Sequence, residues 1–165
     1  MNQSNLRPAL FLDRDGVINH DPDDYTRNIL EFTILPGVLE ALKRFSDAGY
    51  VIIVITNQGG IAKDLYSIYD FYEIDRYMRA TFLEAGIQYL DTYFCPHHDA
   101  ISQCLCRKPH PGMIDKAIAV HGIDRAHSFM IGDKFRDVEA AEAAGVKGIK
   151  VDVNGDLREL VLPAS

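Results

Sequence analysis

Carboxylic acids end two strand-like apolar segments of this sequence. Asp13 closes residues 8–13 and is followed by Asp15, while Asp133 closes residues 127–133. A single acid at a strand end is often only a turn residue or a helix cap. In a parallel sheet, however, the carboxyl ends of the strands meet at one edge, where ligands bind. The three acids are therefore candidates for one shared site.

A third strand-like segment, residues 50–56, also ends in polar side chains. Thr56 is its last residue, and Asn57 and Gln58 follow directly. Helix capping does not require acids at two strand ends together with a Thr-Asn pair at a third. The pattern indicates a polar functional site along one edge of the predicted sheet.

Clustered carboxylates repel one another and need a cation between them. Mg²⁺ suits such a site, because it prefers oxygen ligands and binds through one or two carboxylates plus a substrate phosphate. Asp13 and Asp133 are the candidate magnesium ligands. A carboxylate can also attack phosphorus, so Asp13 is a candidate nucleophile and Asp15 a candidate general acid and base. We expect the pKa of Asp15 to be raised, since a general acid must carry a proton.

Three cysteines and a histidine lie within twelve residues. Cys95, His97, Cys104 and Cys106 form the pattern C-x-H-x6-C-x-C. Thiolates and an imidazole at short spacing suit tetrahedral Zn²⁺, and four protein ligands make the site closed and structural. Buried free cysteines or a redox pair are the alternative interpretations, and His98 is an alternative to His97.

This cysteine-rich segment leads directly into Arg107 and Lys108. A lysine is a compact point charge that can bind a transferring phosphoryl group. Pro109 and Pro111 stiffen the chain on the far side. A bound zinc ion would therefore hold both basic residues in place.

Strand-like and helix-like segments alternate along the chain. Apolar runs rich in β-branched or aromatic residues predict strands at 8–13, 50–56, 89–95, 127–133 and 147–153. Apolar periodicity and flanking Pro or Gly residues predict helices at 36–49, 67–85, 111–122 and 137–145. The alternation predicts a doubly wound α/β domain with a mainly parallel, five-stranded sheet. No large cap domain is expected, so the polar segment 20–30 and the zinc loop should border an open site.

Length and composition bound the remaining possibilities. The 165 residues favour one domain, 1–165, with a zinc loop at about 95–109. A net charge of −7 argues against nucleic-acid binding. No apolar stretch approaches the roughly 20 residues that span a bilayer, and the first ten residues do not resemble a signal peptide. We expect a cytoplasmic protein with no membrane partner, and a monomer.

Four motifs together resemble one enzyme superfamily. They are D-R-D-G-V-I-N at 13–19, T-N-Q at 56–58, C-R-K-P-H-P-G-M at 106–113 and G-D-K at 132–134. They are similar to the haloacid dehalogenase superfamily of phosphatases, over about residues 8–152. Within it they resemble the branch that acts on heptose 1,7-bisphosphate and histidinol phosphate, which also carries a zinc loop.

The resemblance implies a role for each motif. Asp13 would be the nucleophile and Asp15 the general acid and base. Mg²⁺ would be held by the side chains of Asp13 and Asp133 and by the backbone carbonyl of Asp15. The residues that contact the phosphoryl group or the rest of the substrate would be Arg14, Thr56, Asn57, Gln58, Arg107, Lys108 and Lys134.

The resemblance thus implies a Mg²⁺-dependent phosphomonoesterase that acts on a small phosphorylated metabolite. Heptose 1,7-bisphosphate, cleaved at position 7 in the synthesis of lipopolysaccharide precursors, is the first choice, because T-N-Q-x-G-I-A at 56–62 resembles that branch. Gly59 and Lys63-Asp64 depart from its pattern. Either Arg107 or Lys63 could bind a second phosphate.

Histidinol phosphate is the alternative substrate, since acids at 21, 23 and 24 could bind an amine. A phosphotransferase and a non-catalytic zinc- and phosphate-binding adaptor are more distant alternatives.

Overall fold

The computed structural model describes residues 6–162, and a parallel sheet lies at its centre. The strands are β1 (Ala9–Leu12), β2 (Val51–Asn57), β3 (Tyr89–Cys95), β4 (Phe129–Gly132) and β5 (Lys147–Lys150). Their order is β3-β2-β1-β4-β5, and each neighbouring pair is parallel. This confirms the predicted fold class. β5 is shorter than the segment 147–153 that the sequence predicts.

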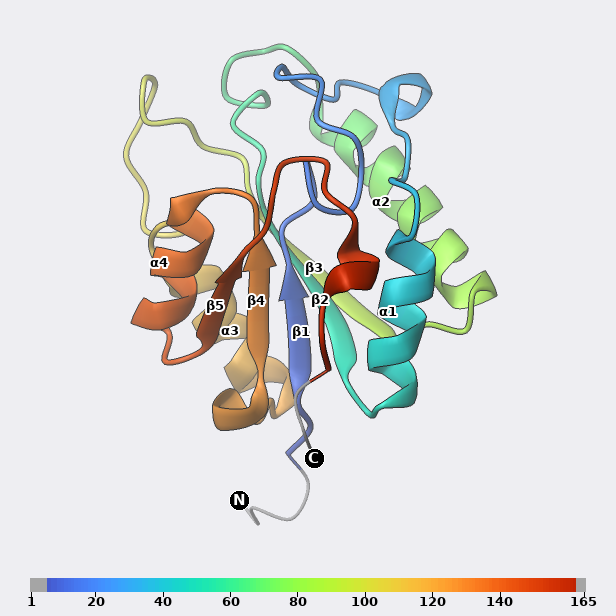
Figure 1. The fold of residues 1–165 in the computed structure, drawn as a ribbon. Coiled ribbons are helices and arrows are strands. Elements are labelled where there is room, and N and C mark those ends of the chain that lie inside the picture. The colour runs from blue at the N-terminus through green and yellow to red at the C-terminus, as the bar shows by residue number, and fades with distance from the viewer. Residues whose placement is uncertain (1–5, 163–165) are drawn as a thin grey trace.

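Helices cover both faces of the sheet (Figure 1). They are α1 (Val38–Asp47), α2 (Ile68–Glu84), α3 (Gly112–His121) and α4 (Phe135–Ala143). Short 3₁₀ helices lie at Ile29–Glu31, Arg125–His127 and Leu157–Glu159. The segment between β1 and α1 contains only the first of these, so no cap domain is inserted there. Among the described residues, no helix is long and apolar enough to cross a lipid bilayer.

Alternate residues of each central strand pack into two separate cores. On one face, Leu10 and Leu12 of β1 pack with α1, α2 and Leu157. On the other face, Ala9 and Phe11 pack with α3 and α4. A strand buried on both sides needs apolar residues at every position, which is why β1 has no exposed residue. The continuous apolar runs in the sequence are the direct cause of this layering.

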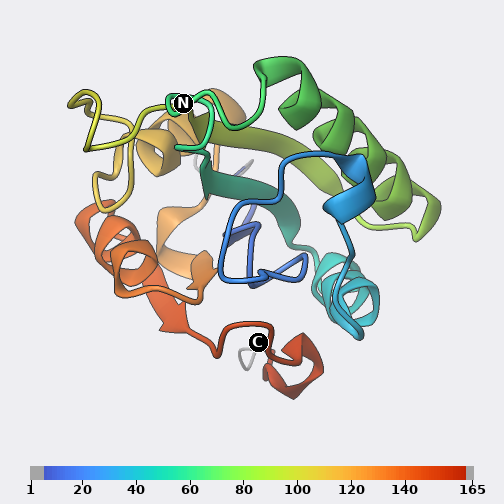
Figure 2. The ribbon, with the colours of Figure 1, turned by 90° about the horizontal axis from the view of Figure 1, so that it is seen from above.

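The carboxyl ends of the strands, and the loops that follow them, lie together at one edge. In the view onto that edge, the segment after β1 crosses over the sheet (Figure 2). The chain turns in opposite directions from β1 and β4, which are neighbours. A crevice forms where the winding reverses, and ligands bind there in sheets of this kind.

The beginning of β1 depends on a side-chain hydrogen bond. The backbone N–H of Ala9 donates to Oγ of Ser128 at 2.9 Å, and both residues are buried. We expect Ser128→Ala to lower the free energy of unfolding by about 1–3 kcal/mol, because it leaves a buried N–H without an acceptor. Urea denaturation measures this change. Exposed Ser102 provides the control: Ser102→Ala should change stability by less than about 0.5 kcal/mol, and equal effects of the two substitutions would contradict the account.

Candidate active site

Three carboxylates meet where β1 and β4 end. Asp13 follows β1, Asp133 follows β4, and Asp137 lies in the first turn of α4. All three are buried, and one carboxylate oxygen from each lies within 4.8 Å of the others. Two of these acids are the predicted magnesium ligands, and Asp137 is an addition from the structure.

Lys108 lies between two of these acids, Asp13 and Asp137, and is itself buried. Its Nζ is 2.9 Å from Oδ1 of Asp13 and 2.7 Å from Oδ1 of Asp137. It also donates to the backbone carbonyl of Ile55 at 2.7 Å. The ammonium group of Lys108 thus joins Asp13, Asp137 and the end of β2.

One buried ammonium group does not neutralise three buried carboxylates. Burial, together with the negative charge of Asp137, raises the pKa of Asp13 to about 7 against the opposing effect of Lys108. Neither oxygen of Asp133 has a well-aligned hydrogen-bond donor, although Nζ of Lys134 lies 3.0 Å from Oδ2. Buried carboxylate oxygens without donors fit a hard divalent cation, so these residues suit Mg²⁺.

Two glycines allow the acids to come this close. Gly16 has a φ of +82°, and a Cβ there would lie 2.8 Å from Oδ2 of Asp133. A Cβ at Gly132 would lie 2.2 Å from Cβ of Asp137. Asp137 is held by its own helix, where its Oδ2 accepts from the backbone N–H of Lys134 at 3.0 Å. Any larger residue at either glycine would displace a carboxylate.

Asp15 is surrounded by hydrogen-bond donors. Its Oδ1 accepts from Arg14 and from Asn19, each at 3.0 Å, and its Oδ2 accepts from Gln58 at 2.9 Å. Burial acts to raise the pKa of Asp15, but the charge of Arg14 and these hydrogen bonds outweigh it and hold the pKa below its usual value. The expected raised pKa is therefore wrong for the free protein.

Arg14 lies behind Asp15 and does not line the pocket. Its guanidinium carbon is 5.8 Å from the ring centroids of both Phe32 and Phe71. Its Nη2 donates to Asp15 at 3.0 Å and to Oε1 of Gln58 at 3.3 Å. Arg14 was expected to contact substrate, but this position instead makes it a support for Asp15.

The residues after β2 connect the acids with the lysine. Both side-chain groups of Asn57 bond to the backbone of Lys108: Oδ1 accepts from its N–H at 3.0 Å, and Nδ2 donates to its carbonyl at 3.1 Å. Nε2 of Gln58 donates to Oγ1 of Thr56 at 2.9 Å, and the hydroxyl of Tyr66 donates to Oε1 of Gln58. The polar ends of the strands thus form one connected network.

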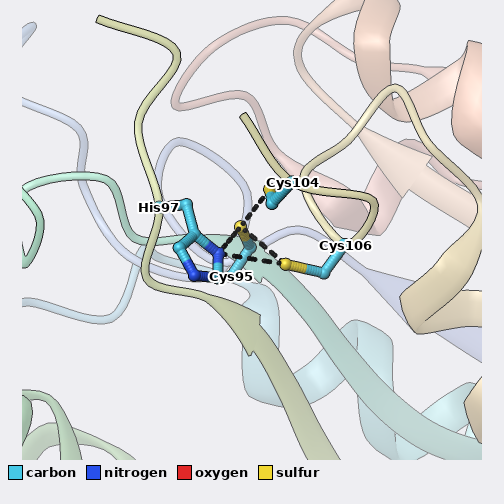
Figure 3. Close-up of side chains that lie close together, drawn as sticks. All are labelled: Cys95, His97, Cys104 and Cys106. Atoms are coloured by element: carbon cyan, nitrogen blue, oxygen red, sulfur yellow. Dashed lines mark hydrogen bonds between the residues drawn. The ribbon is translucent and has the colours of Figure 1, made fainter. Parts of the chain in front are cut away.

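The cysteine-rich segment brings its four predicted ligands together (Figure 3). Sγ of Cys95 lies 3.1 Å from Sγ of Cys106 and 3.6 Å from Sγ of Cys104, and Nδ1 of His97 lies 3.3 Å from Sγ of Cys106. Two thiolates at ~2.3 Å from tetrahedral zinc lie about 3.8 Å apart, so the cluster fits Zn²⁺. His98 points elsewhere, since its Nδ1 accepts from the backbone N–H of Ala100.

Arg107 is held by the same loop. Its Nη1 donates to the carbonyl of His97 at 3.0 Å, and its Nε lies 3.4 Å from Oδ2 of Asp99. The loop therefore fixes Arg107 through its own backbone, next to Lys108. Arg107 does not line the pocket over the acids.

The pocket lies over Asp13 and Asp15. The segment 21–26 forms one wall as predicted, and Asn57, Gln58 and Tyr66 line another part. Lys134 and Arg136, at the beginning of α4, complete the lining. Of the predicted zinc loop, Lys108 reaches Asp13 beneath the pocket, while the lining itself comes from the segment after β2.

Sequence reasoning left three of these residues without a role in the site. Asp137 lies four residues after Asp133, about one helical turn, and this spacing is a signal that the sequence contains. Tyr66 and Arg136 carried no such signal, because only the folded chain brings them to the pocket.

Comparisons with known proteins agree with this geometry. The family model described as HAD-hydrolase-like matches residues 105–160. D-glycero-β-D-manno-heptose-1,7-bisphosphate 7-phosphatase of Vibrio cholerae is 43% identical over 151 residues, covering 88% of this chain and 80% of its own. The enzyme of the same name from Escherichia coli K12 is 40% identical, covering 87% and 78%.

A solved structure is also similar. The D,D-heptose 1,7-bisphosphate phosphatase of B. bronchiseptica, crystallised with magnesium and phosphate, has a TM-score of 0.83 and 33% identity, over 92% of this chain and 84% of its own. With these similarities, the chain belongs to the haloacid dehalogenase superfamily and, within it, to the family of the D-glycero-D-manno-heptose-1,7-bisphosphate 7-phosphatases.

Proposed function

We propose that this protein is a Mg²⁺-dependent phosphomonoesterase that removes the phosphate at position 7 of D-glycero-D-manno-heptose 1,7-bisphosphate. The observation that carries the proposal is the group of buried acids around Lys108, with Nζ 2.9 Å from Oδ1 of Asp13. Relatives at about 40% identity that are named for this reaction support the choice of substrate.

The first step uses Asp13 as the nucleophile. Its carboxylate oxygen attacks phosphorus, the new O–P bond forms, and the bond from phosphorus to the sugar oxygen breaks. Asp15 gives a proton to the departing sugar oxygen. The product of this step is an aspartyl-phosphate and a free sugar hydroxyl group.

The second step releases phosphate. Asp15, now ionised, takes a proton from water, and the water oxygen attacks the phosphorus of the aspartyl-phosphate. The bond between phosphorus and the Asp13 oxygen breaks, which restores the carboxylate. The three donors around Asp15 favour its ionised form, which is the form that this step needs.

Charge neutralisation is shared between a cation and the protein. Mg²⁺, held by the side chains of Asp13 and Asp133 and the backbone carbonyl of Asp15, would neutralise the phosphoryl oxygens and keep Asp13 ionised. Lys108 supplies a fixed positive charge beside the attacking oxygen. Thr56 and Asn57 would border the phosphoryl group, and Lys134, which lines the pocket, would face the rest of the substrate.

The zinc ion has a structural role in this proposal. Cys95, His97, Cys104 and Cys106 would bind it, and all four coordination positions would be filled by protein. The last ligand lies two residues before Lys108. A bound zinc ion would therefore limit the freedom of the chain that carries the lysine.

The nucleophile can be tested by substitution. Asp13→Asn should lower phosphate release by more than about 10³-fold, because an amide cannot form the acyl phosphate. The fold should remain, as measured by circular dichroism and urea denaturation. Asp47→Asn, at an exposed acid of α1, is the control and should retain full activity. Turnover by the Asp13 variant would reject this assignment.

The substrate can be tested by comparing two phosphate esters. Purified protein with Mg²⁺ should release phosphate from heptose 1,7-bisphosphate with a kcat/KM at least about tenfold above that for histidinol phosphate, a discrimination of roughly 1.4 kcal/mol. A preference for histidinol phosphate would reverse the choice. Added sugar or alcohol acceptors should not become phosphorylated, and a phosphorylated acceptor would indicate a transferase.

The zinc ligands can be tested with two adjacent histidines. Metal analysis should find about one zinc per chain in the unmodified protein. His97→Ala should weaken zinc binding more than about tenfold, whereas His98→Ala should leave the zinc content unchanged. Zinc loss in the second variant alone would identify His98 as the ligand, and a zinc-free protein with freely titrating thiols would reject the site.

A further inference from the structure

The pocket has only two positively charged lining residues in the described part of the chain, Lys134 and Arg136. Nζ of Lys134 lies 3.0 Å from Oδ2 of Asp133, so its charge is already paired. Arg136 is exposed. No carboxylate oxygen of residues 6–162 lies within 4.0 Å of its guanidinium nitrogens, the distance that defines an ion pair. Its guanidinium group is therefore an unpaired cation at the pocket.

The two acids of the pocket wall, Asp21 and Asp24, suit sugar hydroxyls better than a phosphate. Asp24 is paired with Arg27 at 2.8 Å, and Oδ1 of Asp21 accepts from the backbone N–H of Asp23. Carboxylates repel a phosphate dianion, but they accept hydrogen bonds from hydroxyl groups. The side of the pocket formed by residues 21–26 would accordingly face the sugar.

The two cations that the sequence suggests for a second phosphate have partners in the structure. Nη1 of Arg107 donates to the carbonyl of His97, and its Nε lies 3.4 Å from Asp99. Nζ of Lys63 donates to the hydroxyl of Tyr25 at 3.0 Å. Neither residue lines the pocket, whereas Arg136 does.

We propose that Arg136 binds the second phosphate of the substrate, the one that remains on the sugar after the reaction. This inference rests on the proposed function, because it assumes a sugar bisphosphate. A guanidinium group binds phosphate oxygens through two parallel N–H···O bonds. The first phosphate is neutralised near Lys108, so the second needs a separate cation in a chain of net charge −7. Arg136 makes the pocket selective for a bisphosphate over a monophosphate.

The test compares heptose 1,7-bisphosphate with heptose 7-phosphate, which has the same reacting end but lacks the second phosphate. The unmodified protein should prefer the bisphosphate. Arg136→Ala should lower kcat/KM for the bisphosphate by about 10- to 100-fold, mainly by raising KM. It should change kcat/KM for the monophosphate by less than about twofold. Arg136→Lys should recover part of the preference, because it keeps the charge and loses the paired hydrogen bonds.

Arg76→Ala is the matched control, since this exposed arginine of α2 does not line the pocket. It should leave both substrates unaffected. An unchanged preference in folded Arg136→Ala, or an unmodified protein that treats both substrates alike, would overturn the subsite while leaving the phosphatase in place. Failure to release phosphate from either substrate would overturn the proposed function and the subsite with it.

Discussion

A buried lysine among buried acids is the constraint on which this site depends. Lys108 is fully enclosed and contacts Asp13, Asp137 and the carbonyl of Ile55. A buried charge is tolerated only when partners surround it, and removing one partner leaves the other uncompensated. The three contacts therefore specify each other's positions. They also join parts of the chain that are far apart in sequence: the end of β1, the end of β2, the zinc loop and the beginning of α4.

The zinc loop and the strand ends share the task of placing this lysine. Asn57 bonds to both backbone groups of Lys108, and Cys106, two residues earlier, lies in the sulfur cluster. The backbone of Lys108 is thus held by Asn57 and by the nearby sulfur cluster. Its side chain is held by three acceptors: Asp13, Asp137 and the carbonyl of Ile55. Such preorganisation matters for charge-stabilised reactions, because the protein need not rearrange as charge develops. It also explains how a chain of net charge −7 can hold an anion: the positive charge is local and rigid.

The sequence predicted the fold and the acids that lie at strand ends, because both follow from local patterns. The continuous apolar runs predict strands covered on both faces, and parallel strands bring Asp13 and Asp133 to one edge. The sulfur cluster was equally predictable from spacing. The position of Arg14 could not be predicted from the sequence. Phe32 and Phe71, which enclose its guanidinium group, lie 18 and 57 residues further along the chain. The role of Tyr66 could not be predicted either, because its hydroxyl meets Gln58 only after the chain between them has turned back.

Asp15 shows why its chemistry could not be deduced from its role alone. A general acid needs a proton, but the donors from Arg14, Asn19 and Gln58 favour the carboxylate in the free protein. A bound phosphate dianion would change this balance, because a like charge nearby raises the pKa of a carboxyl group. The same residue could then gain a proton when the substrate binds and act as a base after the sugar has left. The donors set the resting state, and the substrate itself supplies the charge that shifts it.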